Sequence, residues 1–155
     1  MTTKRPKTIV VRIPGPNGTT TQQQVEVAAR APIRIGCYTM AERMTILELS
    51  FLMFTKKYPG LGHLQLKSAF SGQLRVHQCT ALRGGPGFVV GISDLLKGML
   101  EMRLLGRPHT DKRTYEAPIT ITKKGERHIK RQSVRLQRAA QKLVYTDVLE
   151  RMAMI

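Results

Sequence analysis

Residues 40–57 carry apolar side chains around nearly the whole circumference of an expected helix. Met44, Leu47, Phe51 and Phe54 recur at spacings of three and four residues, the period of an α-helix. Further apolar residues occupy much of the remaining surface: Ile46, Leu49, Leu52 and Met53. A helix that is apolar on all sides must be covered on all sides, so we expect this one at the centre of the fold.

Both ends of this helix are marked in the sequence. Thr39 is a suitable N-cap, and Glu42 follows it at the spacing of a capping box. Tyr58-Pro59-Gly60 stops the helix. Glu48 in the middle of the run argues against insertion into a membrane. The chain also has no run of about 18 apolar residues, the length that a membrane-spanning helix needs.

The N-terminal part of the chain has the pattern of a β-hairpin. Residues 7–13 are rich in β-branched residues, and Val25, Val27 and Ala29 alternate with polar neighbours over residues 22–30. The intervening residues 14–18 read PGPNG, which is a dense turn signal. We therefore expect two antiparallel strands.

The rest of the chain predicts short strands and further helices. We expect strands over about 73–82, 88–90 and 115–122, a helix from Ser93-Asp94 to about Leu105, a basic helix over 123–145 and a short last helix ending at 152–155. The predicted fold class is α+β, with an N-terminal β-hairpin, a central buried helix, further short strands and a basic C-terminal helix. We expect one globular domain over residues 1–155, with residues 1–7 as a mobile basic arm.

The charge is strongly positive and unevenly distributed. The chain has 26 Lys and Arg residues against 10 Asp and Glu, for a net charge of +16. Residues 107–145 hold eleven basic and three acidic residues, and so about half of that excess. Five cations in this segment, spaced by four, four, three and four residues, share one helical face: Arg127, Arg131, Arg135, Arg138 and Lys142. Lys123, Lys124 and Lys130 widen the positive side.

A face of this kind is either simply solvated or binds a polyanion. A solvated face usually interleaves Glu with its cations, yet no acidic residue occurs between Arg127 and Thr146. The composition therefore favours contact with phosphates. In the N-terminal arm, Lys4, Arg5 and Lys7 either add backbone contacts to the same polyanion or form a solubilising tail.

A glycine-rich loop offers a second, weaker phosphate signal. Arg83, Gly84, Gly85 and Gly87 surround Pro86, and free N–H groups in such a loop can cradle a phosphate. The loop lacks both the ending of a P-loop and the glycine spacing of a dinucleotide site. A plain turn is the alternative interpretation.

The sequence shows no catalytic residues, cofactor motif or metal site. The acidic residues do not cluster, and the four histidines and two cysteines lack the spacing of a zinc site. Cys37 and Cys79 are expected to be buried thiols, although whether they pair is open. A small metal-independent nuclease using His109 or His128 stays open as an alternative.

These observations predict a non-enzymatic structural or assembly protein that binds RNA, DNA or a ribonucleoprotein through phosphate contacts, with a coat- or matrix-like role. The alternative is a peripheral protein that binds an anionic membrane surface through the same cations. Residues 152–155 are apolar, and we expect them to pack into the protein's own core rather than against a neighbouring subunit. We expect a homo-oligomer. The N-terminus lacks the apolar segment of a secretory signal, so the expected location is intracellular, in cytoplasm or nucleus, or a virus particle.

Overall fold

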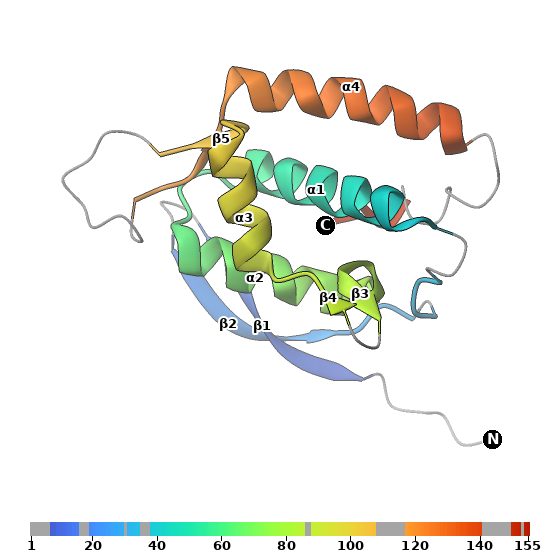
Figure 1. Cartoon of the computed structure of the whole chain (residues 1–155). Helices are drawn as coiled ribbons and strands as arrows, with labels where there is room; N and C mark the ends of the chain where they lie inside the picture. The colour runs from blue at the N-terminus through green and yellow to red at the C-terminus, as the bar shows by residue number, and fades with distance from the viewer. Residues whose placement is uncertain are drawn as a thin grey trace.

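A computed structural model describes residues 7–15, 19–29, 31–34, 38–85, 88–107, 117–140, 150–152 and 154–155 (Figure 1). The elements follow one another as β1 (Thr8–Pro14), β2 (Thr20–Glu26), α1 (Met40–Lys57), α2 (His63–Val76), the 3-10 helix η2 (Thr80–Arg83), β3 (Gly84–Gly85), β4 (Phe88–Val89), α3 (Ile92–Glu101), β5 (Leu105–Gly106), β6 (Thr120–Ile121) and α4 (Lys123–Ala140). Residues 150–152 are again helical. The fold is α+β, as the sequence predicted.

Helix α1 forms the centre of the molecule, which confirms the prediction from its apolar pattern. The Thr39 side chain accepts a hydrogen bond from the Glu42 main-chain N–H at 3.1 Å and so caps the first turn. In Figure 1, α4 lies on one side of α1, and α2 with the β1–β2 hairpin lies on the other. Phe51 meets Phe70 of α2 edge-to-face, with ring centroids 4.8 Å apart, so aromatic packing joins the two helices.

The hairpin is confirmed, and it packs against α2. Its strands are antiparallel, with Thr8 opposite Glu26 and Pro14 opposite Thr20, so β2 lies earlier in the chain than the predicted segment. Val11 is the buried residue of β1. A Cβ on Gly72 of α2 would lie 3.0 Å from the Cβ of Val11, so the missing side chain lets strand and helix approach closely.

The strand predicted over residues 73–82 is wrong. The chain continues as helix α2 to Val76 and then forms η2. Leu66, Phe70 and Leu74 repeat every four residues and are all fully buried, so the helical period buries one continuous face. Gln78 then adopts a left-handed φ of 57°, which turns the chain after the helix.

Several predicted boundaries also change. Helix α3 ends at Glu101 rather than near Leu105, because Arg103 takes a left-handed φ of 59° and the chain continues into β5. Residues 88–90 contain β4, as predicted. Only Thr120–Ile121 of the segment 115–122 pair as a strand, with β5; residues 115–116 lie outside the described part. Helix α4 begins at Lys123, and residues 141–149 are likewise not described.

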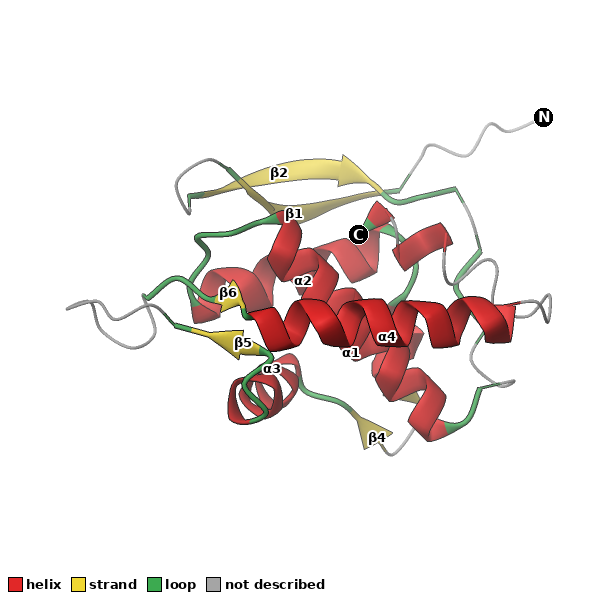
Figure 2. Cartoon of the chain, turned by 90° about the horizontal axis from the view of Figure 1, so that it is seen from above, coloured by secondary structure: helices red, strands yellow, loops and turns green. Residues whose placement is uncertain are grey.

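Two of the C-terminal residues are part of the hydrophobic core. Met152 and Ile155 are 5% and 4% exposed and belong to the main apolar cluster, as the sequence predicted, whereas Met154 of the same segment is 48% exposed. Among the described helices, none is long and apolar enough to cross a membrane. Figure 2, seen from above, shows α4 lying along α1 at the surface of the molecule.

Candidate functional site

Helix α4 is held against the core by one narrow face. It spans 18 residues and so is about 27 Å long. Gly125 is buried, and a Cβ at this position would overlap the main-chain carbonyl of Leu104 and the Ile121 side chain. Ile129, one turn later, packs partly buried against the core. This contact face leaves the opposite side of the helix free for solvent or a ligand.

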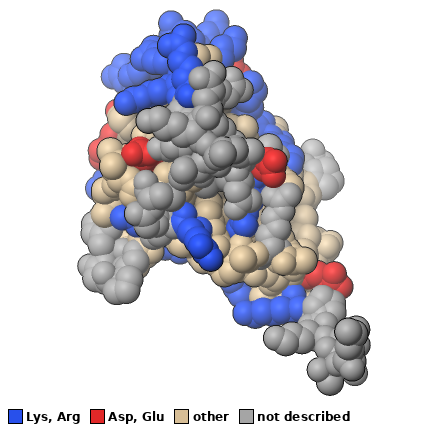
Figure 3. Space-filling view, turned by 90° about the vertical axis from the view of Figure 1, so that its right-hand side faces the viewer, with Lys and Arg blue, Asp and Glu red and all other residues tan. Residues whose placement is uncertain are grey.

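The opposite side carries the α4 basic surface, which comprises Lys123, Lys124, Arg127, Lys130, Arg131, Arg135 and Arg138. All seven residues are exposed. At about 100° of rotation per residue, they fall within roughly 140° of the helix circumference. In Figure 3 the Lys and Arg atoms gather at the top of the molecule, where Figure 1 places α4. The predicted Lys142 lies outside the described residues.

Within the described residues, acidic side chains do little to neutralise the charge of this surface. Glu126 is the single acidic residue in the sequence of α4, and its carboxylate lies 4.0 Å from the Nζ of Lys56 on α1. Both side chains are about half exposed, so this pair adds little stability. Lys124 donates a 3.0 Å hydrogen bond from Nζ to the Met102 carbonyl, which ties the first turn of α4 to the end of α3.

The surface is hollowed in its C-terminal half. Four cations surround Val134 in a shallow depression of about 570 Å³: Lys130, Arg131, Arg135 and Arg138. Val134 is 49% exposed. The alkyl parts of long basic side chains can cover such a residue while their charged ends reach outward. The depression thus presents several cations to one elongated ligand.

The other predicted phosphate contacts are less well placed. Lys7 is exposed just before β1, whereas Lys4 and Arg5 lie outside the described residues. In the glycine-rich loop, Gly84 and Gly85 form β3 and pair with Val89 and Phe88.

Arg83 and Gly87 belong to the same loop. The Nε of Arg83 donates a 3.1 Å hydrogen bond to the carbonyl of Val90, so this group stabilises the small hairpin. Gly87 is not described. A phosphate site in this loop stays a prediction.

Titratable groups do not gather into a metal site: within the described ranges, no three His, Cys, Asp or Glu side chains are placed to hold an ion. Burial raises the pKa of Glu48 on α1, and the partly buried His128 on α4 lowers that pKa to a smaller extent. Cys79 is a buried thiol whose Sγ lies 3.3 Å from the His77 carbonyl. His109 and Cys37 lie outside the described residues.

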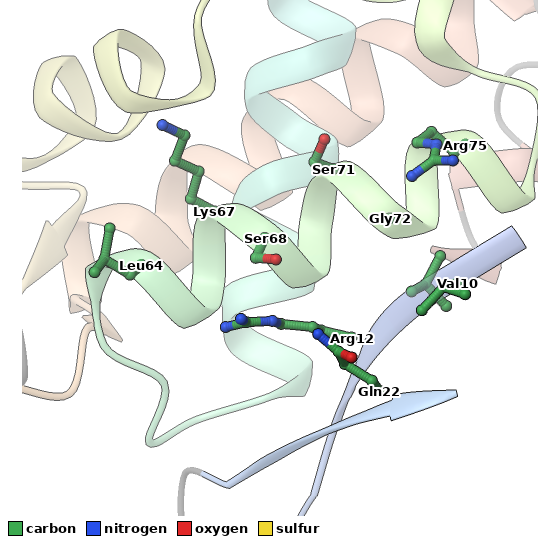
Figure 4. A pocket seen from close by; sticks show the side chains of 10 residues that line it. Val10, Arg12, Gln22, Leu64, Lys67, Ser68, Ser71, Gly72 and Arg75 are labelled. Atoms are coloured by element: carbon green, nitrogen blue, oxygen red, sulfur yellow. The ribbon is translucent and has the colours of Figure 1, made fainter. Parts of the chain in front are cut away.

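One further group of cations was not predicted from the sequence as a site. Arg12 on β1 and Lys67 and Arg75 on α2 line a groove of about 550 Å³, which we call the β1–α2 groove (Figure 4). The helical spacing of Leu66, Phe70 and Leu74 was the signal for α2, and it would have placed Lys67 and Arg75 on one helix face. The pairing of α2 with β1 has no comparable signal in the sequence.

Comparison of the chain with protein-family models, curated proteins and solved structures found no match.

Proposed function

We propose that this protein is a non-enzymatic structural or assembly protein that binds RNA or DNA through the phosphate backbone. The observation that carries the proposal is the α4 basic surface, whose seven exposed cations extend over about 22 Å of the helix, from Lys123 to Arg138. Lys and Arg that neutralise phosphates release condensed counterions, and this release drives binding. A coat- or matrix-like role is consistent with such binding.

The contacts should involve phosphates rather than bases. The sequence of α4 contains no Phe, Tyr or Trp, so the helix has none of these rings on which a base would stack. Phosphate contacts position a protein on nucleic acid without reading its sequence. We therefore expect similar affinities for unrelated sequences.

The burial of the C-terminus favours nucleic acid over an anionic membrane. A membrane-binding surface needs apolar side chains that insert beside its cations. The apolar C-terminal residues Met152, Met154 and Ile155 would be candidates for that role, but Met152 and Ile155 are buried in the core, which leaves Met154, 48% exposed, as the accessible side chain of the three. Among the described side chains of the α4 basic surface, Val134 is a large apolar residue that is exposed.

The test is a charge reversal in the middle of the surface, Arg131→Glu with Arg135→Glu. Both side chains are exposed, so the variant should fold. Removing two phosphate contacts should weaken binding to a labelled 20-nucleotide oligomer by about tenfold or more, and should reduce the slope of log K against log salt by about two. Fluorescence anisotropy measures both quantities, and circular dichroism checks the fold.

The matched control is Lys57→Glu with Lys97→Glu. These residues are exposed on α1 and α3, and their reversal changes the net charge by the same amount. The control should bind much more tightly than the α4 variant. Equal affinities of the wild type and the folded α4 variant would contradict the proposal.

The purified protein offers a direct first measurement. The chain has no tryptophan and four tyrosines, so nucleic acid carried through purification would dominate the ultraviolet absorbance. We expect an elevated ratio of absorbance at 260 nm to that at 280 nm that falls after a high-salt wash, because salt competes with phosphate contacts.

A further inference from the structure

The β1–α2 groove gathers positive and hydrogen-bonding side chains from two elements. Arg12 comes from β1, Gln22 from β2, and Lys67, Ser68, Ser71 and Arg75 come from α2. No Asp or Glu is among the residues that line it. Arginine, lysine, hydroxyl and amide groups can all donate hydrogen bonds, so this lining suits an anion rich in oxygen atoms.

The local sequence explains why these groups share one groove. Lys67, Ser71 and Arg75 are four residues apart and form one row along α2 (Figure 4). On β1, Val11 packs into the space beside Gly72, and the next residue, Arg12, is exposed. The close approach of β1 to α2 therefore brings Arg12 to the same groove as the α2 row.

The spacing of the cations indicates a chain of anionic groups rather than a single one. Residues eight positions apart on a helix are about 12 Å apart along its axis, which is the case for Lys67 and Arg75. In Figure 4 the Lys67 side chain points away from both Arg75 and Arg12. A polyanion can contact both residues at once, as successive phosphates of a nucleic-acid backbone would.

The elements that line the groove and the helix that carries the α4 basic surface lie on opposite sides of α1. Figure 1 shows α4 at one extreme and the β1–β2 hairpin at the other, with α1 and α2 between them. One nucleic-acid segment lying along α4 therefore leaves the groove open to a second segment.

We propose that the β1–α2 groove is a second phosphate-backbone site, so that one protein molecule bridges two segments of nucleic acid. This inference rests on the proposed function for the identity of the polyanion. Bridging would let the protein condense or package nucleic acid in addition to coating it.

The experiment is a bridging assay on the full chain. A biotinylated 20-nucleotide oligomer is held on beads, protein is added at low salt, and capture of a second, fluorescent oligomer is measured. The variant Lys67→Glu with Arg75→Glu should reduce capture by about tenfold, because two phosphate contacts become repulsive. Its binding to a single oligomer in solution should change far less, because α4 is intact.

Two further variants test whether the loss of oligomer capture is specific to the groove. Arg12→Glu alone removes the β1 contribution without altering α2, and it should reduce capture by a smaller factor. The control Lys57→Glu with Lys97→Glu, which does not line the groove, should capture the second oligomer nearly as well as the wild type.

The possible failures are distinguishable. If the wild type binds no oligomer in solution, the proposed function fails, and bridging fails with it. If the Lys67→Glu, Arg75→Glu variant captures as well as the wild type, bridging arises from self-association, and the groove inference alone is overturned. If that variant keeps capture but loses flotation with phosphatidylserine vesicles, the groove binds a lipid headgroup, and the inference is again overturned.

Discussion

The guanidinium of Arg151 donates a 2.8 Å hydrogen bond from Nη2 to the main-chain carbonyl of Ala31, which lies 120 residues earlier in the chain. Nη1 of the same side chain lies 3.3 Å and 3.4 Å from the carbonyls of His77 and Gln78. Arg151 is 5% exposed. One buried cation thus joins the C-terminal helical residues, the end of α2 and the segment that follows the hairpin.

Replacing Arg151 with Ala should destabilise the fold by about 2–4 kcal/mol. The substitution removes the charged donor from three carbonyls, and hydrogen bonds to charged groups contribute more than neutral ones. The Gln78 carbonyl still accepts from the Ile33 N–H and the His77 carbonyl from the Cys79 thiol, whereas the Ala31 carbonyl loses its Arg151 donor. Arg151→Lys should be intermediate, because an ammonium cannot reach three carbonyls with the geometry of a guanidinium. Urea denaturation followed by circular dichroism measures both free energies of unfolding.

A neighbouring residue provides the control. Met154 is 48% exposed, so Met154→Ala should change the free energy of unfolding by less than about 0.5 kcal/mol. If Arg151→Ala unfolded at the same urea concentration as Met154→Ala, the three-carbonyl contact would have no part in stability.

Gly125 and Gly98 form a matched pair of glycine substitutions. Gly125→Ala should lower stability by about 1–3 kcal/mol, because its Cβ would overlap the Leu104 carbonyl and push α4 away from the core. Gly98→Ala should raise stability by about 0.5–1 kcal/mol, because nothing lies within 4 Å of its Cβ and alanine favours the helix. Thermal denaturation compares the two variants. A gain in stability for Gly125→Ala would show that α4 does not lie this close to Leu104.

The lowered pKa values of two histidines predict that the fold loses stability in mild acid. Burial lowers the pKa of His63 below its ordinary value of 6.5, and the charges of Arg107 and Lys67 lower it further. Burial likewise lowers the pKa of His77, with Lys57 and Arg151 acting in the same direction. The unfolded chain therefore binds more protons between the folded pKa values and 6.5. The contribution of the two histidines to the free energy of unfolding is fully present above pH 6.5. It is lost as the pH falls toward their folded pKa values.

The measurement is the free energy of unfolding from about pH 7.5 to pH 5.5. His63→Asn with His77→Asn should flatten its dependence on pH. Burial raises the pKa of Glu48, so the titration of that carboxyl opposes the histidines and is common to both proteins. An unchanged dependence in the variant would show that these histidines titrate alike in the folded and unfolded chains.

The sequence predicted the elements whose signals are local. Thr39 and Glu42 marked the start of α1, and the apolar residues that follow were sufficient to place that helix in the core. The β1–β2 hairpin was predicted from its turn and its alternation. Helix α2 was missed because Leu74 and Val76, both buried, also fit the alternation of a strand over the short segment considered.

The two candidate sites differ in the same way, because one depends on local sequence and the other on a contact between distant segments. The α4 basic surface depends on spacing within one helix, so residues such as Arg127 and Arg131 were identified before the fold was known. The β1–α2 groove depends on Arg12 meeting Lys67 and Arg75 across a contact between distant segments. That contact exists because Gly72 leaves room for Val11, and only a tertiary structure reveals it.

Val134 separates nucleic-acid binding from membrane binding at the same surface. It is exposed in the depression among Lys130, Arg131, Arg135 and Arg138. Val134→Ser keeps every cation, so oligonucleotide affinity should stay within about twofold of the wild type, since phosphate contacts dominate that affinity. A membrane surface would bury the valine, and its loss would weaken vesicle binding by roughly fivefold or more. Anisotropy and flotation with phosphatidylserine vesicles give the two affinities. A variant that bound oligomers normally but lost flotation would assign α4 to a membrane as well, because an inserted apolar residue has no role in binding phosphates alone.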